Sequence, residues 1–191
     1  MIVLVTGGAR SGKSSFAERL CMKYAESAVY IATAQAFDQE MEQRIALHRE
    51  QREGTAFQWT TLEEPLQLAE RLTSPNAIIG GNLIGEAPLV LVDCLTLWLS
   101  NVLLAVVDEP DAEARVMEQI HQLETAVTAY PGTIILVTNE VGSGIVPEYP
   151  LGRMYRDLAG ILNRMIARIS DQVFLVTAGI PIELKSREYI L

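Results

Sequence analysis

A glycine-rich stretch near the start of the chain constrains its fold more than any other feature. The apolar run of residues 2–5 leads into the octapeptide GGARSGKS, which extends from Gly7 to Ser14 and matches G-x-x-x-x-G-K-[ST]. The residues from Lys13 to Tyr24 that follow have the spacing of a helix. A buried strand, a glycine turn and a helix in this order are typical of a phosphate-binding loop, or P-loop.

The residue types of this octapeptide explain why it would hold phosphate. Glycines let backbone N–H groups approach and surround the phosphate oxygens, and the N-terminus of the following helix adds partial positive charge. Lys13 is expected to reach the β- and γ-phosphates as a catalytic residue, and the Ser14 hydroxyl to hold Mg²⁺. We therefore expect nucleotide contacts from Gly7, Gly8, Ala9, Arg10, Ser11, Gly12, Lys13 and Ser14.

A P-loop also requires an acidic residue near the metal. Asp93 directly follows the apolar run of residues 89–92, which is the expected form of such a site. Asp93 is therefore predicted to lie beside Mg²⁺. The alternative is that Asp93 caps the next helix, with Thr96 and Leu97 in its first turn.

The rest of the pattern predicts the fold class. Nearly continuous apolar runs, typical of strands buried on both faces, alternate with longer segments of helical spacing. This favours a P-loop NTPase-like, three-layer α/β/α fold with a mostly parallel central sheet. The further expected strands are residues 89–92, 133–137 and 173–176, a weaker one at 28–32 and a last one at 180–184; the helices are 111–130 and 151–169.

Composition places limits on the partners. A chain of 191 residues fits one domain over 1–191, with residues 74–88 as a connecting loop. Its net charge of −9 argues against general nucleic-acid binding, because phosphate backbones select a basic surface. Cys21 and Cys94 are expected to be reduced and buried. No signal peptide and no apolar stretch of about 20 residues is seen, so a cytoplasmic protein is expected.

One of the two histidines has chemically suggestive neighbours. On a helix expected over residues 38–52, His48 lies four residues from both Arg44 and Arg52 and next to Arg49. Arginines offset charge on phosphate oxygens and favour a neutral, nucleophilic imidazole. The alternative is a solvated helix face on which His48 is incidental. His121 lies off the apolar stripe of its helix and is expected at the surface.

A second glycine-containing segment follows the strand at residues 133–137. Asn139 and Glu140 begin it, and Gly142 and Gly144 indicate tight turns. Loops after buried strands carry function in α/β sheets, but a structural turn fits equally well, so no catalytic role is assigned.

Three sequence blocks beyond the P-loop indicate a family. They are YIATAQ at residues 30–35, DQEMEQRIALH at 38–48 and NEVGSGIVP at 139–147. With the P-loop, they resemble the adenosylcobinamide kinase/adenosylcobinamide-phosphate guanylyltransferase family of cobalamin biosynthesis, over essentially the whole chain.

The resemblance implies two reactions. The first is phosphorylation of adenosylcobinamide with ATP or GTP. The second is GMP transfer from GTP to adenosylcobinamide phosphate through a GMP–histidine intermediate at His48. It also implies a homotrimer. The guanine-nucleotide contacts that it implies are Thr33, Ala34, Gln35, Arg49, Glu50, Gln51, Arg52, Glu63 and Asp93.

Two other functions compete with this interpretation. One is a P-loop kinase for another small alcohol, in which His48 is unused. The other is a nucleotide switch or a subunit of an assembly ATPase. A guanine-specific switch would carry an N/T-K-x-D motif, which the sequence lacks.

Overall fold

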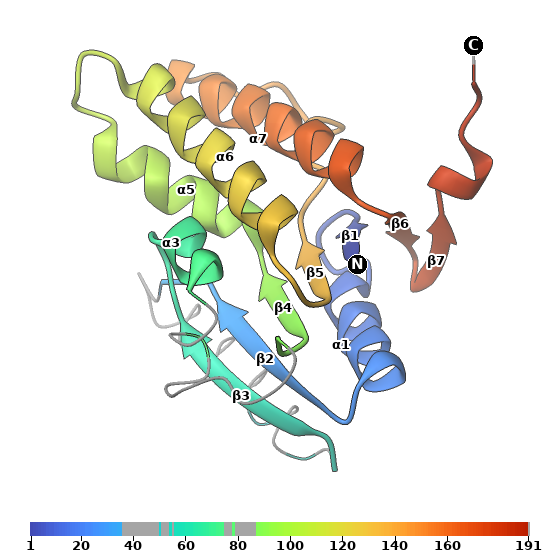
Figure 1. The fold of residues 1–191 in the computed structure, drawn as a ribbon. Helices are drawn as coiled ribbons and strands as arrows, with labels where there is room; N and C mark the ends of the chain where they lie inside the picture. The colour runs from blue at the N-terminus through green and yellow to red at the C-terminus, as the bar shows by residue number, and fades with distance from the viewer. Residues whose placement is uncertain (36–49, 51–53, 55, 75–77, 79–86, 191) are drawn as a thin grey trace.

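A computed structural model of the protein describes residues 1–35, 50, 54, 56–74, 78 and 87–190. Their strands form one sheet of seven strands in the order β3-β2-β4-β5-β1-β6-β7 (Figure 1). All neighbouring strands are parallel except β6 and β7, which form an antiparallel pair. The strands are β1 (Ile2–Thr6), β2 (Ser27–Ala32), β3 (Gln58–Glu63), β4 (Val90–Asp93), β5 (Ile134–Val137), β6 (Gln172–Thr177) and β7 (Ile180–Glu183).

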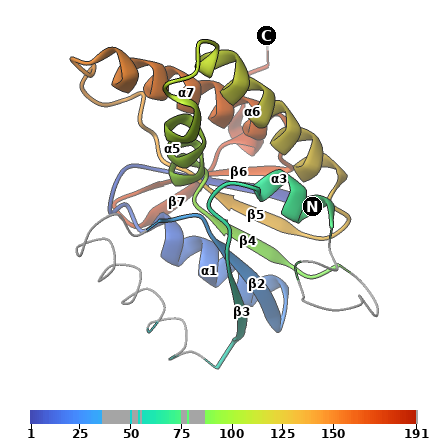
Figure 2. The same ribbon diagram turned by 90° about the vertical axis from the view of Figure 1, so that its left-hand side faces the viewer.

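Helices cover both faces of this sheet. Helix α1 lies on one face, and α3, α5, α6 and α7 lie on the other (Figure 2). The predicted three-layer α/β/α arrangement with a mostly parallel sheet is therefore confirmed. The helices are α1 (Lys13–Tyr24), α3 (Leu68–Thr73), α5 (Leu95–Val106), α6 (Ala112–Ala129) and α7 (Pro150–Ile169), followed by a 3₁₀ helix at Lys185–Arg187.

The layers enclose two apolar cores, and β1 contributes to both. Leu4 packs in the larger core beneath α5, α6 and α7, whereas Val3 and Val5 pack in the smaller core beneath α1. Successive side chains of a strand point to opposite faces, so a strand covered on both sides needs apolar residues throughout. This explains the continuous apolar runs at the P-loop strand and at the strands beside it.

The strands and helices expected within the described residues are present, and their ends lie within about one residue of the expected positions. Neither β3 nor α3 was expected from the sequence. The side chains of β3 are partly or fully exposed because β3 lies at the edge of the sheet, so its sequence, QWTTLE, has no continuous apolar run. Most of the predicted loop at 74–88 and of the predicted helix at 38–52 lies outside the described residues. No described helix is long and apolar enough to cross a membrane.

Candidate nucleotide-binding site

The first residues after β1 have a backbone that only glycine allows. Gly7 has a φ of +158°, and a Cβ built on it would lie 2.4 Å from the Val176 carbonyl oxygen. Gly12, the residue before α1, has a φ of +90° in the left-handed region. Both positions of the G-x-x-x-x-G pattern are therefore required by the local backbone.

The loop between these glycines rests on the C-terminal hairpin. The Gly179 N–H, in the turn between β6 and β7, donates a hydrogen bond of 2.9 Å to the Ser11 carbonyl. A Cβ on Gly12 would lie 3.4 Å from the Gly179 Cα. Ala178 and Gly179 both have positive φ values, which form this tight turn. No sequence motif pointed to this support.

Two residues of the first turn of α1 are placed as a phosphate site requires. Lys13 is 9% exposed, and its Nζ donates to the Gly8 carbonyl at 3.1 Å. Ser14 follows it, half-buried, and the first turn of α1 carries no acidic residue to neutralise the helix N-terminus. The buried Ser11 Oγ has no hydrogen-bond partner among the described residues. These groups leave donors and positive charge for an anion.

Asp93 ends β4 at the same edge of the sheet. Its Oδ2 accepts a hydrogen bond of 3.1 Å from the Tyr30 hydroxyl. The N-cap of α5 is Cys94, and no side chain caps this helix. The alternative prediction that Asp93 caps the helix is therefore wrong, because its carboxylate is directed to Tyr30 instead.

The charges of Asp93 and of Lys13 in the P-loop both act on the buried thiol of Cys94. Burial and, next, the negative charge of Asp93 raise the pKa of Cys94 to about 11. The charge of Lys13 acts on the same thiol in the opposite direction. Lys13 and Asp93 therefore lie around one buried group, although their strands, β1 and β4, are separated by β5.

A second set of contacts joins the ends of β2 and β4. The Thr33 hydroxyl donates to the Cys94 carbonyl at 2.7 Å and accepts from the Cys94 N–H at 2.8 Å. Asn101 Nδ2 donates to the Thr33 carbonyl at 2.8 Å. Thr33 is fully buried, so its observed contacts are those of a structural brace. Its predicted nucleotide contact stays a prediction.

The residues after β5 form a polar cluster with β1 and α7. The Thr6 hydroxyl donates to Glu140 Oε1 at 2.8 Å, and the Glu140 N–H donates to the Gly7 carbonyl at 3.2 Å. Asn163 on α7 donates to the Asn139 carbonyl at 3.0 Å and accepts from Thr138 at 2.6 Å. The sequence analysis did not single out Asn163, because a polar residue beside an apolar one is common on an amphipathic helix.

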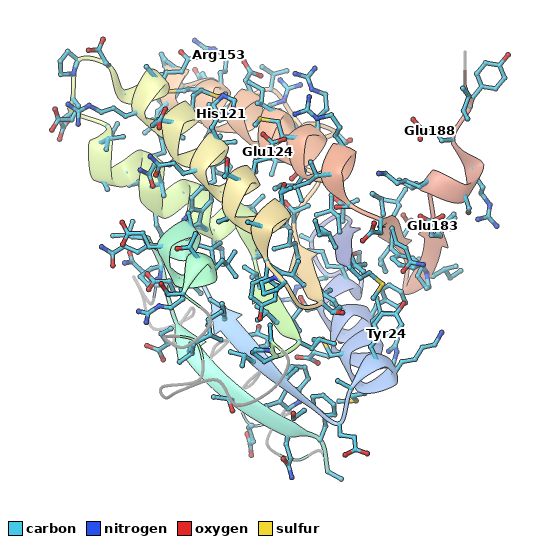
Figure 3. All side chains as sticks on the ribbon, in the orientation of Figure 1. Tyr24, His121, Glu124, Arg153, Glu183 and Glu188 are labelled. Carbon is cyan, nitrogen blue, oxygen red and sulfur yellow. The ribbon has the colours of Figure 1, made fainter. Side chains whose placement is uncertain are left out.

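The carboxyl ends of the parallel strands thus bring most of the predicted residues to one edge. The P-loop follows β1, Asp93 ends β4, half-buried Ala34 and Gln35 follow β2, and exposed Glu63 ends β3. His48, Arg49, Gln51 and Arg52 lie outside the described residues, whereas Glu50 is described and exposed. His121 lies on α6 with Glu124, exposed as predicted (Figure 3).

A family match accounts for this combination of features. Residues 3–184 match the family CobU, described as cobinamide kinase / cobinamide phosphate guanyltransferase. The chain belongs to this family. The resemblance found in the sequence blocks is confirmed, and the family is one of enzymes.

Members of the family from several bacteria resemble the whole chain. The bifunctional adenosylcobalamin biosynthesis protein CobP of Pseudomonas aeruginosa is 47% identical over 182 residues, which cover 95% of this chain and 96% of that protein. The corresponding proteins named CobU are 38% identical in Salmonella typhimurium and 39% in Escherichia coli, each over 97% of this chain and 100% of the relative.

A solved structure supports the fold from another direction. An ATPase domain of known structure superposes with a TM-score of 0.51 at 12% identity, covering 91% of this chain and 68% of that chain. At this identity the likeness concerns the fold alone. It agrees with a P-loop NTPase-like arrangement of the CobU family chain.

Two side chains at this edge of the sheet could hold a metal ion that accompanies a nucleotide. The described residues contain no group of three or more His, Cys, Asp or Glu able to hold a metal. Mg²⁺ that accompanies a nucleotide needs only one or two protein oxygens, because phosphates and water supply the rest. The half-buried carboxylate of Asp93 and hydroxyl of Ser14 are oxygen donors of the required kind.

Proposed function

We propose that this protein phosphorylates the aminopropanol hydroxyl of adenosylcobinamide with ATP or GTP, and then transfers GMP from GTP to the resulting phosphate. The product is adenosyl-GDP-cobinamide. The observation that carries the proposal is that a loop with the G-x-x-x-x-G-K-[ST] pattern, with Lys13 and Ser14 at the start of α1, belongs to a chain that matches the CobU family from residue 3 to residue 184.

The kinase step depends on position and charge. The backbone N–H groups of the loop and Lys13 hold the β- and γ-phosphates, so the acceptor hydroxyl meets the γ-phosphorus in line. Ser14 and Asp93 would hold the metal. When bound, Mg²⁺ offsets negative charge on the phosphate oxygens.

The guanylyl step uses His48 as nucleophile. Its neutral imidazole nitrogen forms a bond to the α-phosphorus of GTP, and pyrophosphate leaves with the electron pair of the broken P–O bond. An oxygen of adenosylcobinamide phosphate then attacks the same phosphorus, and the N–P electron pair returns to His48. We assign the guanine-nucleotide contacts of this step to Thr33, Ala34, Gln35, Arg49, Glu50, Gln51, Arg52, Glu63 and Asp93.

A covalent-labelling experiment tests the proposal. The protein is incubated with Mg²⁺ and GTP labelled at the α-phosphate, denatured and examined for label that is acid-labile and base-stable. Label is expected in the wild type and absent in His48→Ala. His121→Ala is the matched control, because His121 is the other of the two histidines and is exposed on α6. An unlabelled wild type that binds GTP would refute the guanylyl transfer, and phosphorylation without labelling would favour a kinase alone.

We further infer a cytoplasmic homo-oligomer, with a homotrimer as the form implied by the resemblance. Exposed apolar side chains support a covered surface: Ile145 is 95% exposed, Tyr149 75% and Val146 57%. Light scattering of the purified protein tests this inference, and a monomer at micromolar concentration would contradict it.

A further inference from the structure

Among the described carboxylate residues at the ends of these strands, Glu140 is the one whose backbone is hydrogen-bonded to the start of the P-loop. It follows β5, the strand that pairs with β1, and its N–H donates to the carbonyl of Gly7, the first residue of the loop, at 3.2 Å. Neighbouring strands lie about 5 Å apart, so Asp93 at the end of β4 is about 10 Å from the line of β1 and Glu63 on β3 about 20 Å.

The side chain of Glu140 is fixed by one oxygen and presents the other. Oε1 accepts hydrogen bonds from the Thr6 hydroxyl at 2.8 Å and from Asn163 Nδ2 at 3.5 Å. Oε2 has no hydrogen-bond or ion-pair partner within the described part of the chain, and the residue is exposed. Oε2 is therefore open to a hydroxyl group that approaches the phosphate site.

We propose that Glu140 is the general base of the kinase step and touches the acceptor hydroxyl through Oε2. This inference rests on the proposed function. The hydroxyl proton passes to Oε2 while the hydroxyl oxygen bonds to the γ-phosphorus. The bond from this phosphorus to the bridging oxygen breaks, and the nucleoside diphosphate leaves with the electron pair. Glu140 then releases the proton to water.

The other carboxylates at this edge are already engaged or distant. Asp93 accepts from Tyr30 and is assigned to the metal, and Glu64 is buried in an ion pair of 2.9 Å with Arg71. Glu63 lies at the far side of the sheet. Among the described carboxylates at these strand ends, Glu140 alone combines an open oxygen with a direct contact to the P-loop.

The two reactions of the proposed function differ in their need for a base. An aliphatic hydroxyl holds its proton strongly, so its attack benefits from a proton acceptor. The acceptor in the guanylyl step is a phosphate, which has lost its second proton above a pKa of about 6. Removing a base should therefore slow the kinase step and leave guanylyl transfer intact.

The variant Glu140→Gln separates these two steps. The glutamine Oε1 still accepts from Thr6, while the nitrogen that replaces Oε2 accepts no proton. General bases contribute about 100- to 10,000-fold, so we expect kcat for adenosylcobinamide phosphorylation to fall about 100-fold or more, with KM for ATP within about twofold. Covalent GMP labelling, and GMP transfer to supplied adenosylcobinamide phosphate, should stay within about twofold of the wild type.

Glu148→Gln is the matched control, because it makes the same change at an exposed glutamate of the same loop. It should leave both reactions unchanged. A Glu140→Gln kinase rate within a few-fold of the wild type would overturn the proposal. An equal loss of both reactions would also overturn it, since Glu140 would then act by shaping the P-loop. A wild type that performs neither reaction would instead refute the proposed function.

Discussion

The two strand ends that form the candidate nucleotide site are stabilised in different ways. After β1, the shape of the loop depends on backbone conformation. Gly7 passes close to the Val176 carbonyl, and Gly12 leads into α1 with a φ of +90°. After β4, the backbone is held in place by side chains. Thr33 and Asn101 bind the backbone at the ends of β2 and β4 through hydrogen bonds of 2.7–2.8 Å. Glycines therefore shape the first end, and buried polar side chains hold the second.

This difference determines how each end responds to substitution. In the turn after β1, an extra methyl group would clash at Gly7 and would be strained by the positive φ at Gly12, so substitution at these two glycines is costly. A side-chain brace tolerates volume but not the loss of a partner, because a buried polar group left unpaired costs about 1–3 kcal/mol. The predictions that follow test these two kinds of sensitivity.

Gly7→Ala should have the largest effect. Its Cβ would lie 2.4 Å from the Val176 carbonyl oxygen and 2.7 Å from Ser11 Oγ, so the loop must move away from β6. We expect a loss of about 2–4 kcal/mol in the free energy of unfolding, from overpacking and backbone strain together. Nucleotide affinity should weaken at least about 100-fold, because the N–H groups no longer converge. Urea unfolding and calorimetric titration with GTP measure both.

Gly8→Ala is the matched control for stability. A Cβ at Gly8 would meet no atom within 4 Å. Its free energy of unfolding should therefore remain within about 0.5 kcal/mol of the wild type. Equal stability of the two variants would show that the contact with Val176 does not define the loop.

Thr33→Val should reduce stability by about 2–3 kcal/mol. The change keeps the shape of the side chain but leaves both the N–H and the carbonyl of Cys94 without the hydroxyl partner. Thr60→Val, an exposed site on β3, is the control and should be nearly neutral. If Thr33→Val kept its stability and lost GTP affinity, Thr33 would be a nucleotide contact rather than a brace.

The same contrast explains what the sequence predicted and what it did not. The P-loop and its flanking elements could be predicted because the backbone at Gly7 and Gly12 requires glycine. These requirements fix the spacing of the two glycines in the sequence, and this spacing can be recognised. The position of Asp93 at the end of a buried strand was predicted from the apolar run before it, and its role beside the metal stays a prediction. Its partner Tyr30 was not predicted, because β2 and β4 are adjacent only in the folded sheet.

Two further features had no usable signal in the sequence. The support of Ser11 by Gly179 joins residues at opposite ends of the chain through the backbone, so no side chain records it. The edge strand β3 has polar residues because its side chains face solvent, and it therefore lacks the apolar run by which the buried strands were found.

The reactivity of the Cys94 thiol measures how well the end of β4 is protected from solvent. Its pKa of about 11, against 9.0 for a free thiol, leaves about 100-fold less thiolate at pH 8. In a Cys21→Ala protein, reaction of Cys94 with an aromatic disulfide should be at least about 100-fold slower than that of a free thiol. Asp93→Asn should increase the rate, because the charge of Asp93 raises the pKa of this thiol. Labelling of the native protein at the free-thiol rate would contradict the buried brace.

The smallest effect should come from acid at the hairpin that supports the P-loop. Glu183 on β7 (Figure 3) has its pKa lowered to about 2, from 4.5, chiefly by hydrogen bonding to Ser186 and then by the N–H groups of Val173 and Lys185. A lowered pKa means that the ionised carboxylate stabilises the folded state above about pH 4.5, and that this contribution is lost as pH falls toward about 2. The carboxylate is partly exposed, so solvent screening keeps the effect small.

Amide hydrogen exchange at Gly179 measures whether this loss of stability in the hairpin extends to its contact with the P-loop. The Gly179 N–H is bonded to Ser11 in the turn of the same hairpin, so its protection should fall as Glu183 is protonated. Glu183→Gln should lower the protection at neutral pH and remove its dependence on acid. Glu188→Gln, at an exposed glutamate shortly after β7, should keep the wild-type profile. If the protection of Gly179 were the same in all three proteins, the hairpin would support the P-loop through its turn alone, and the backbone-built end of the site would not depend on any side-chain charge.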